Sequence, residues 1–334
     1  MRAHDARDAH FAPVYPAAAT DHGATNTPSA TAKGAPSRVT VRVPATSANV
    51  GVGYDCLGLA LDLMATFTFE PADNLVIDGC PEQFRGEDNL VWTSYLDTCR
   101  RLYERPMPLR ITIDSPIPLS GGLGSSSACV VAGVAAAQAL HAGEFDRASA
   151  LDIATQIEGH PDNVAPAILG GLVSSFVDTG RTHSIRFDIA ENLAFVAIAP
   201  PYEVRTTDAR KAMPKVVSTE TAVWQIGHCV AAVHAIETGD AKLLSAACQD
   251  KLHEPYRSPL IPDYEPLKRT ALAAGAAAYL ISGSGSTMLA VADGLDAAQR
   301  VAAAVENMVE NRIEGLWVRV LSSNFGGTVV TIER

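Results

Sequence analysis

The stretch that most constrains this chain is PLSGGLGSSSA, residues 118–128, which holds three glycines and four serines. The segment ITIDSPIPL before it alternates apolar positions, and CVVAGVAAAQAL after it is almost wholly apolar. This pattern predicts an extended strand, a glycine turn and a helix that is buried on nearly all sides. Amide groups of a glycine turn at a helix start favour an anion, and serine hydroxyls can reach Mg²⁺. The stretch therefore predicts either a phosphate site built from backbone and hydroxyl groups or a glycine turn that serines cap.

The two common nucleotide loops do not fit this stretch. A P-loop has the form GxxxxGK[ST], and no lysine follows these glycines. A dinucleotide-binding loop has the form GxGxxG with an acidic residue further on. The stretch lacks this glycine spacing, which excludes a dehydrogenase of that type.

Composition excludes several other classes of protein. The 334 residues are 47% hydrophobic, enough for one large or two medium domains. The net charge of -11 and the lack of a basic run argue against nucleic acid as a partner. The apolar runs are interrupted, so we expect no membrane span. Six cysteines without a CxxC pair indicate reduced core thiols of a cytoplasmic protein and no zinc site: Cys56, Cys80, Cys99, Cys129, Cys229 and Cys248.

The order of predicted elements, in which hairpins alternate with helices, favours an α+β fold over a doubly wound parallel sheet. Residues 1–37 lack apolar periodicity and are predicted to be a disordered tail without a secretory signal. The segments ATFTFEP and NLVIDG predict an antiparallel hairpin. A polar stretch, TGRTHSIRFDIAEN, precedes the apolar strand LAFVAIA, which predicts a domain boundary near residue 190 and domains of 38–190 and 191–334. The other predicted strands are 38–44, 109–113, 193–199, two within 277–292 and a closing strand LWVRVLSSN, and the predicted helices are 89–102, 148–158, 217–237, 242–251, 268–274 and 296–310.

Two further segments concentrate polar groups. ATSANVGVGYDCLGLAL carries Asn49 and Asp55, which predicts either a ligand-binding turn or a loop in which Asp55 caps a helix. EGHPDNVAPAILGG carries Glu158, His160 and Asp162 at a point where Pro161 breaks a helix. That cluster predicts a carboxylate linked to Mg²⁺, a metal site that includes the imidazole, or the capped start of the next helix.

Taken together, these segments resemble a known superfamily. PLSGGLGSSSA, ATSANVGVGYDCLGLAL and ISGSGSTMLAV are similar to the three glycine-containing motifs of the GHMP small-molecule kinases. EGHPDNVAPAILGG and HEPYR resemble the homoserine kinase branch of that superfamily. The resemblance implies an amino-terminal domain similar to ribosomal protein S5 domain 2 and a ferredoxin-like carboxy-terminal domain, with the active site between them. It also implies ATP- and Mg²⁺-dependent phosphorylation of the L-homoserine hydroxyl to give O-phospho-L-homoserine, a step of threonine biosynthesis.

The same resemblance implies roles for individual residues. Asn89 to Val91 matches the adenine pocket, Ser126 and Glu158 match the Mg²⁺-linked positions, and homodimers are common in the family. The residues that match the ATP phosphate loop are Pro118, Leu119, Ser120, Gly121, Gly122, Leu123, Gly124, Ser125, Ser126, Ser127 and Ala128. Those that match contacts to homoserine are Asn49, Asp55, His160, Asp162, Asn163, Arg210 and Arg257, of which Asn49, Asp162, Asn163 and Arg257 are the candidates nearest the reacting hydroxyl.

Two alternatives to a homoserine kinase stay open on the sequence. Another GHMP kinase, such as one of the mevalonate pathway, also binds a carboxylate substrate through arginines. For either arginine, the alternative interpretation is a surface salt bridge. A non-catalytic paralogue that binds nucleotide is the second alternative, and Ser286, where the third motif usually has proline, is the feature that favours it.

Overall fold

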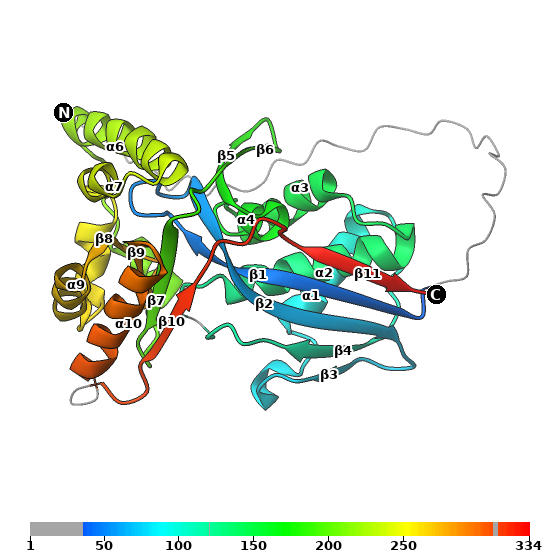
Figure 1. Cartoon of the computed structure of the whole chain (residues 1–334). Helices are drawn as coiled ribbons and strands as arrows, with labels where there is room; N and C mark the ends of the chain where they lie inside the picture. The colour runs from blue at the N-terminus through cyan, green and yellow to red at the C-terminus, as the bar shows by residue number, and fades with distance from the viewer. Residues whose placement is uncertain (1–35, 120, 310–312) are drawn as a thin grey trace, which may run out of the picture. The chain divides into compact units, whose positions relative to one another are not determined.

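The computed structural model describes residues 36–119, 121–309 and 313–334. Nearly all of the predicted tail, residues 1–37, therefore lies outside the described residues. Residues 35–334 form one compact unit (Figure 1). The predicted division into 38–190 and 191–334 stays a prediction.

The larger sheet contains both the first strand, β1, and the last strand, β11. The strand order is β11-β1-β2-β4-β3, and β5 joins β2 and β6. In Figure 1 the red arrow of β11 lies beside the blue arrow of β1, and the two pair antiparallel. The sequence analysis did not predict this last strand. The strands are β1 (Arg38–Ala48), β2 (Leu57–Pro71), β3 (Val76–Asp78), β4 (Leu109–Asp114), β5 (Leu172–Asp178), β6 (Arg181–Phe187) and β11 (Val329–Glu333).

The predicted hairpin between ATFTFEP and NLVIDG is wrong. β2 pairs antiparallel with β4, and β3 pairs in parallel with the far side of β4, with Ile77 opposite Ile111. Because β1 and β4 already occupy the two edges of β2 over ATFTFEP, β3 has no free edge of β2 to join. The polar stretch before residue 190 contains β6, whose side chains are largely exposed.

Helices cover this sheet, and α2 is the central one. It begins with the serines of the glycine stretch, and 72% of it is buried, so a helix with the length and composition of a membrane span is here the core of the fold. Gly133 lets α1 approach closely, because a Cβ there would lie 2.4 Å from the carbonyl oxygen of Val91. These helices are α1 (Leu90–Arg101), α2 (Ser125–Ala142), α3 (Arg147–Glu158), α4 (Val164–Leu169) and the 3₁₀ turn η1 (Glu82–Phe84).

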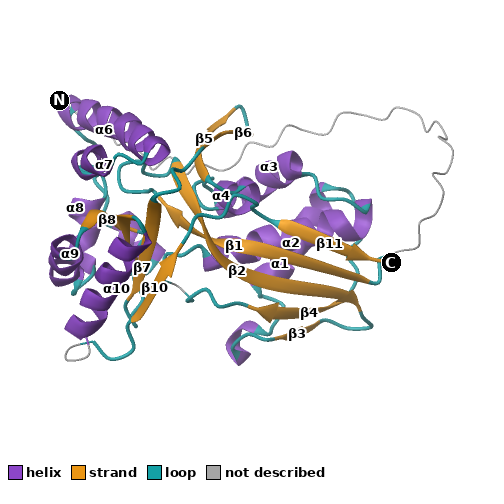
Figure 2. Ribbon diagram, viewed as in Figure 1, coloured by secondary structure: helices purple, strands orange, loops and turns teal. Residues whose placement is uncertain are grey.

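The second sheet has the order β10-β7-β9-β8, and all its pairs are antiparallel (Figure 2). The chain order of strand, helices, strand, strand, helix, strand is the ferredoxin-like arrangement that the resemblance implied. The apolar run of β7 has a clear cause, since alternate residues such as Phe195 and Val196 enter two different hydrophobic cores. The strands are β7 (Leu193–Ala199), β8 (Ala276–Ile281), β9 (Met288–Asp293) and β10 (Trp317–Leu321). The helices are α5 (Thr206–Lys211), α6 (Thr219–Thr238), α7 (Ala241–Ala247), α8 (Glu254–Arg257), η2 (Ser258–Leu260), α9 (Tyr264–Ala273) and α10 (Leu295–Val309).

Candidate active site

The glycine stretch forms a tight turn that leads directly into α2, as the sequence predicts. Gly122 and Gly124 have φ angles of 90° and 70°, in the left-handed region. A Cβ on Gly122 would lie 2.3 Å from the carbonyl oxygen of Ser282, and one on Gly124 would lie 2.0 Å from Oγ1 of Thr46. Both positions therefore require glycine for their backbone angle and for the close approach of neighbouring segments.

The third glycine motif, residues 281–291, holds this turn in place. The amide of Thr287 donates to the carbonyl oxygen of Gly121 at 2.8 Å, and the Ser282 hydroxyl donates to that of Gly122 at 2.6 Å. Ser286 is fully buried, and its hydroxyl donates to the carbonyl oxygen of Tyr202. The serine that departs from the family pattern is thus part of a well-connected turn.

A cavity of about 480 Å³ opens beside the glycine turn. One part of its wall is apolar and includes Phe67, Pro81 and Phe84. Asn89 and Leu90 also line it, whereas Val91 of the predicted adenine segment is buried in the core. The predicted loop residues that line the cavity are Leu119, Gly121, Gly122, Gly124, Ser125, Ser126 and Ser127. Leu123 and Ala128 lie in the hydrophobic core, Pro118 is half-buried, and Ser120 lies outside the described residues.

Asn49 and Asp55 reach the cavity from the loop between β1 and β2. The Asn49 amide donates to the carbonyl oxygen of Gly283 at 2.8 Å, and its Oδ1 accepts from the amide of Asp55 at 3.0 Å. Asp55 does not cap a helix, because the chain continues into β2. The structure thus supports the ligand-binding turn over the capping interpretation.

Glu158 ends α3 next to the serines of α2. The helix stops at Gly159, which has a φ of 89°, so the break precedes Pro161. The hydroxyl of Ser127 donates to Oε1 of Glu158 at 2.9 Å. Ser126, the serine matched to the metal position, lines the cavity together with Glu158. Burial raises the pKa of Glu158 above its usual value.

Beyond the break, Asp55, His160 and Asp162 form a compact cluster. One potential ligand atom from each lies within 4.8 Å of the others. Nδ1 of His160 contacts Oδ1 of the buried Asp162. Burial opposes protonation of the imidazole, but the hydrogen bond and charge of Asp162 outweigh it and raise the pKa of His160. Asn163 accepts from the hydroxyl of Thr46 at 2.7 Å, which ties this segment to β1.

Two arginines complete the polar part of the wall. Arg210, on α5, lies 3.3 Å from a carboxylate oxygen of Asp55 and is partly exposed. Arg257, at the end of α8, is 3% exposed, and its Nη1 donates to the carbonyl oxygen of Gly283 at 2.8 Å. Its guanidinium carbon lies 5.0 Å from the centre of the Tyr54 ring. Burial lowers the pKa of Arg257, so an anionic partner would stabilise its charge. A surface salt bridge therefore does not describe Arg257.

Several residues of the site were not singled out by the sequence analysis. The carbonyl oxygen of Gly283 accepts from both Asn49 and Arg257, and Ser284 also lines the cavity. Both belong to the third glycine motif, so that motif was the available signal. Tyr54, next to Asp55, contacts Arg257, and Thr206, one helical turn before Arg210, lines the cavity. Nothing in their own spacing distinguishes them.

Comparison with known proteins identifies the family. The model of the GHMP kinases N terminal domain matches residues 89–171, and that of the GHMP kinases C terminal domain matches residues 232–311. Homoserine kinase of Clostridium beijerinckii is 37% identical over 297 residues, which cover 87% of this chain and 98% of the relative. That of Caldicellulosiruptor bescii is 38% identical over 259 residues, 76% of this chain and 84% of the relative.

Solved structures agree with this assignment. The crystal structure of homoserine kinase from Cytophaga hutchinsonii has a TM-score of 0.80 and 32% identity, and the match covers 88% of this chain and 98% of that one. Mevalonate kinase of Methanococcus jannaschii shares only the fold, with a TM-score of 0.64, 12% identity and coverage of 85% and 98%. The predicted two-domain GHMP kinase fold is confirmed, and this chain belongs to the homoserine kinase family of the GHMP kinases.

Proposed function

We propose that this chain is a homoserine kinase that transfers the γ-phosphoryl group of ATP to the side-chain hydroxyl of L-homoserine. One observation carries the proposal: a lysine-free glycine turn at a helix start and a set of carboxylates and arginines line the same cavity. The first suits a triphosphate, and the second suits a small zwitterion. The product, O-phospho-L-homoserine, makes the reaction a step of threonine biosynthesis.

The nucleotide is assigned to the end of the cavity formed by the glycine turn. The first amides of α2, an 18-residue helix, point their unpaired N–H groups toward the turn and carry the positive end of the helix dipole. The adenine is assigned to the apolar wall near Phe84 and Leu90. No lysine is needed, because backbone and hydroxyl groups supply the phosphate contacts.

Ser126 and Glu158 are the residues that we assign to Mg²⁺. Hard oxygen ligands are what this ion prefers, and a carboxylate plus a hydroxyl leave the remaining positions for water and phosphate. When bound, the ion would neutralise charge on the phosphates. The cluster of Asp55, His160 and Asp162 offers, in place of a third oxygen, an imidazole that already pairs with Asp162, so it suits Mg²⁺ poorly. Its two carboxylates suit an ammonium group.

The amino acid is assigned to the end of the cavity with charged side chains. Asp55 and Asp162 supply negative charge for the substrate ammonium group, and Arg210 and Arg257 supply positive charge for its carboxylate. Asp55 and Arg210 pair with each other. A zwitterion can replace that pair on both sides at once, whereas a substrate with a carboxylate alone would leave Asp55 unpaired. This difference favours homoserine over mevalonate.

Catalysis then rests on positioning and charge stabilisation. Asn49 and Arg257 share the carbonyl oxygen of Gly283 and so fix each other's direction. Asp162 and Asn163 are held by His160 and Thr46. As the hydroxyl oxygen bonds to the γ-phosphorus, the bond to the ADP oxygen breaks, and the hydroxyl proton passes to an oxygen of the transferred phosphoryl group, so no side chain has to act as a dedicated base.

A substrate panel with ATP and Mg²⁺ tests this function directly. We expect homoserine to produce ADP and a phosphorylated product in equal amounts, and mevalonate to produce neither above background. Phosphorylation of mevalonate in place of homoserine would assign the chain to another branch of the superfamily. ATP binding without ADP release for any substrate in the panel would indicate a non-catalytic paralogue.

We also propose that the enzyme is located in the cytoplasm. The described residues include all six cysteines, and each is free, which fits a reducing cytoplasm. A homodimer, which the family resemblance implies, stays a prediction.

A further inference from the structure

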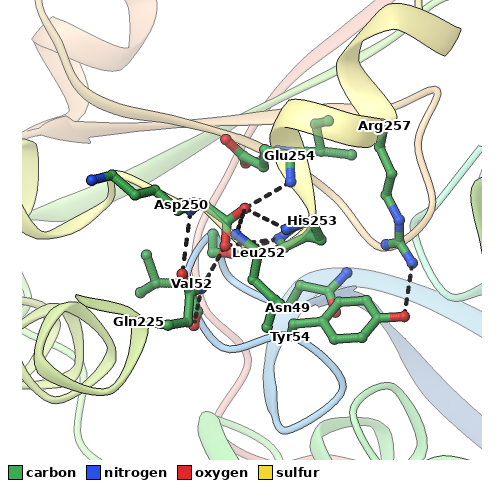
Figure 3. Close-up of polar contacts among 12 residues, drawn as sticks. Asn49, Val52, Tyr54, Gln225, Asp250, Leu252, His253, Glu254 and Arg257 are labelled. Atoms are coloured by element: carbon green, nitrogen blue, oxygen red, sulfur yellow. Dashed lines mark hydrogen bonds and ion pairs between the residues drawn. The ribbon is translucent and has the colours of Figure 1, made fainter. Parts of the chain in front are cut away.

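A buried polar network lies next to the loop that carries Asn49 and Asp55, but its members do not line the cavity (Figure 3). At its centre is Asp250, whose side chain is fully buried. Its Oδ2 accepts from the amides of His253 and Glu254, both at 2.7 Å. Its Oδ1 accepts from Nε2 of Gln225 at 2.5 Å. A buried carboxylate is stable only when it is bonded in this way, so the network is a fixed unit.

The network contacts the loop at two neighbouring carbonyl groups. Nε2 of His253 lies 2.5 Å from the carbonyl oxygen of Gly51, and Nε2 of Gln225 lies 2.8 Å from that of Val52. A carbonyl oxygen only accepts, so His253 carries its proton on Nε2. The two hydrogens of the Gln225 amide are both used, one toward Asp250 and one toward the loop.

The loop needs such support because its backbone is strained. Asn49, Val50 and Gly51 have φ angles of 70°, 40° and 71°. Asparagine and glycine tolerate this left-handed region, but a β-branched valine does not. A conformation of this kind persists only where surrounding contacts determine it. His253 and Gln225 bond to the two carbonyl groups that directly follow the valine.

We propose that His253 and Gln225 are positioning residues that hold the loop 49–55 so that Asn49 and Asp55 face the substrate. Asp250 couples the two. Arg257 lies one turn after His253, the residue that directly precedes α8, so one buried carboxylate orients both sides of the amino-acid site. This inference rests on the proposed function for its kinetic test. It adds residues that touch neither the substrate nor the nucleotide.

The test compares variants that remove the side-chain donor groups, and Gln225→Met also removes the amide oxygen that accepts from the amide of Lys251 at 3.2 Å. His253→Phe keeps a ring next to Tyr54, whose centroid lies 5.5 Å away, but lacks the Nε2 proton. Because a buried carbonyl loses its partner, we expect the KM for homoserine to rise about tenfold while the KM for ATP stays unchanged. His253→Gln, which restores an amide donor, should recover part of that loss. Gln225→Met should act like His253→Phe, and Gln249→Met, at an exposed glutamine, is the matched control.

A second readout does not depend on activity. Amide hydrogen exchange of residues 49–56 should become faster in His253→Phe and Gln225→Met, while exchange in the glycine turn stays as in the original chain. If His253→Phe does not fold, Gln225→Met decides the outcome. Unchanged homoserine KM with unchanged exchange would overturn the proposal, and so would an equal rise in both KM values. A chain that fails to phosphorylate homoserine at all refutes the proposed function, and the exchange measurement still tests the positioning role.

Discussion

The two ends of the cavity are built in different ways. At the end that we assign to the nucleotide, one continuous stretch supplies the turn and the first residues of α2, and its groups are backbone amides and hydroxyls. At the end that we assign to the amino acid, charged side chains arrive from the loop after β1, the end of α3, α5 and α8. The first end depends on local backbone geometry. The second depends on how distant segments pack, and its charges need buried partners.

Because of this contrast, we expect the binding of the two substrates to be weakened by different substitutions. A change in backbone freedom at the glycine turn should affect ATP alone, whereas a change in a buried charge should affect the amino acid alone. Mevalonate kinases at 12–15% identity share the fold of this chain.

The largest effect is expected for Gly124→Val. The new side chain would meet Thr46 at 2.0 Å and would have to adopt a φ of 70°, so we expect ATP binding to weaken at least about 100-fold. Calorimetric titration with ATP and Mg²⁺ measures this, and a thermal melt checks the fold. Gly180→Val, at a φ of 79° in open space between β5 and β6, is the control and should bind ATP normally. Normal ATP binding by Gly124→Val would refute the assignment of the nucleotide end.

A smaller and more selective effect is expected for Arg257→Ala. Loss of a buried cation opposite the substrate carboxylate should raise the homoserine KM by about 100-fold, with little change in the KM for ATP. Arg257→Lys should raise the homoserine KM by a smaller amount than Arg257→Ala, because it keeps the charge but loses the planar fork. Steady-state kinetics with each substrate varied in turn separates the two effects. If both KM values rose equally, the two ends would not be independent, and the comparison would fail.

The smallest effect concerns Glu254, a buried carboxyl at the start of α8. Burial raises its pKa to about 7 from an ordinary value of 4.5. Between these values the folded chain keeps a proton that the unfolded chain releases, so stability should decline by about 2 kcal/mol as pH rises from about 5 to about 7. Urea unfolding at several pH values measures this. Glu254→Gln should flatten the decline, whereas Glu265→Gln, at an exposed position on α9, should leave it unchanged. A pH-independent stability in the original chain would show that Glu254 is ionised when folded.

Local patterns predicted much of the fold and the site. The strand, turn and helix around residues 109–142 follow from glycine content and apolar periodicity. Asn49, Asp55, His160 and Asp162 were found because they cluster in short segments, although only the family resemblance gave them roles. The wrong hairpin between β2 and β3 shows the limit, since two alternating segments in sequence say nothing about which edge each one joins.

What the sequence alone determined is the place of the glycine turn between a strand and a helix, because glycine content and apolar periodicity are local signals, although the third glycine motif holds the turn in place. Only the tertiary structure decided that Asp55 meets Arg210, that Ser127 bonds to Glu158, and that His253 and Gln225 support a strained loop. These contacts join residues 31 to 202 positions apart. Their formation depends on the packing of whole helices and sheets, which no local pattern records.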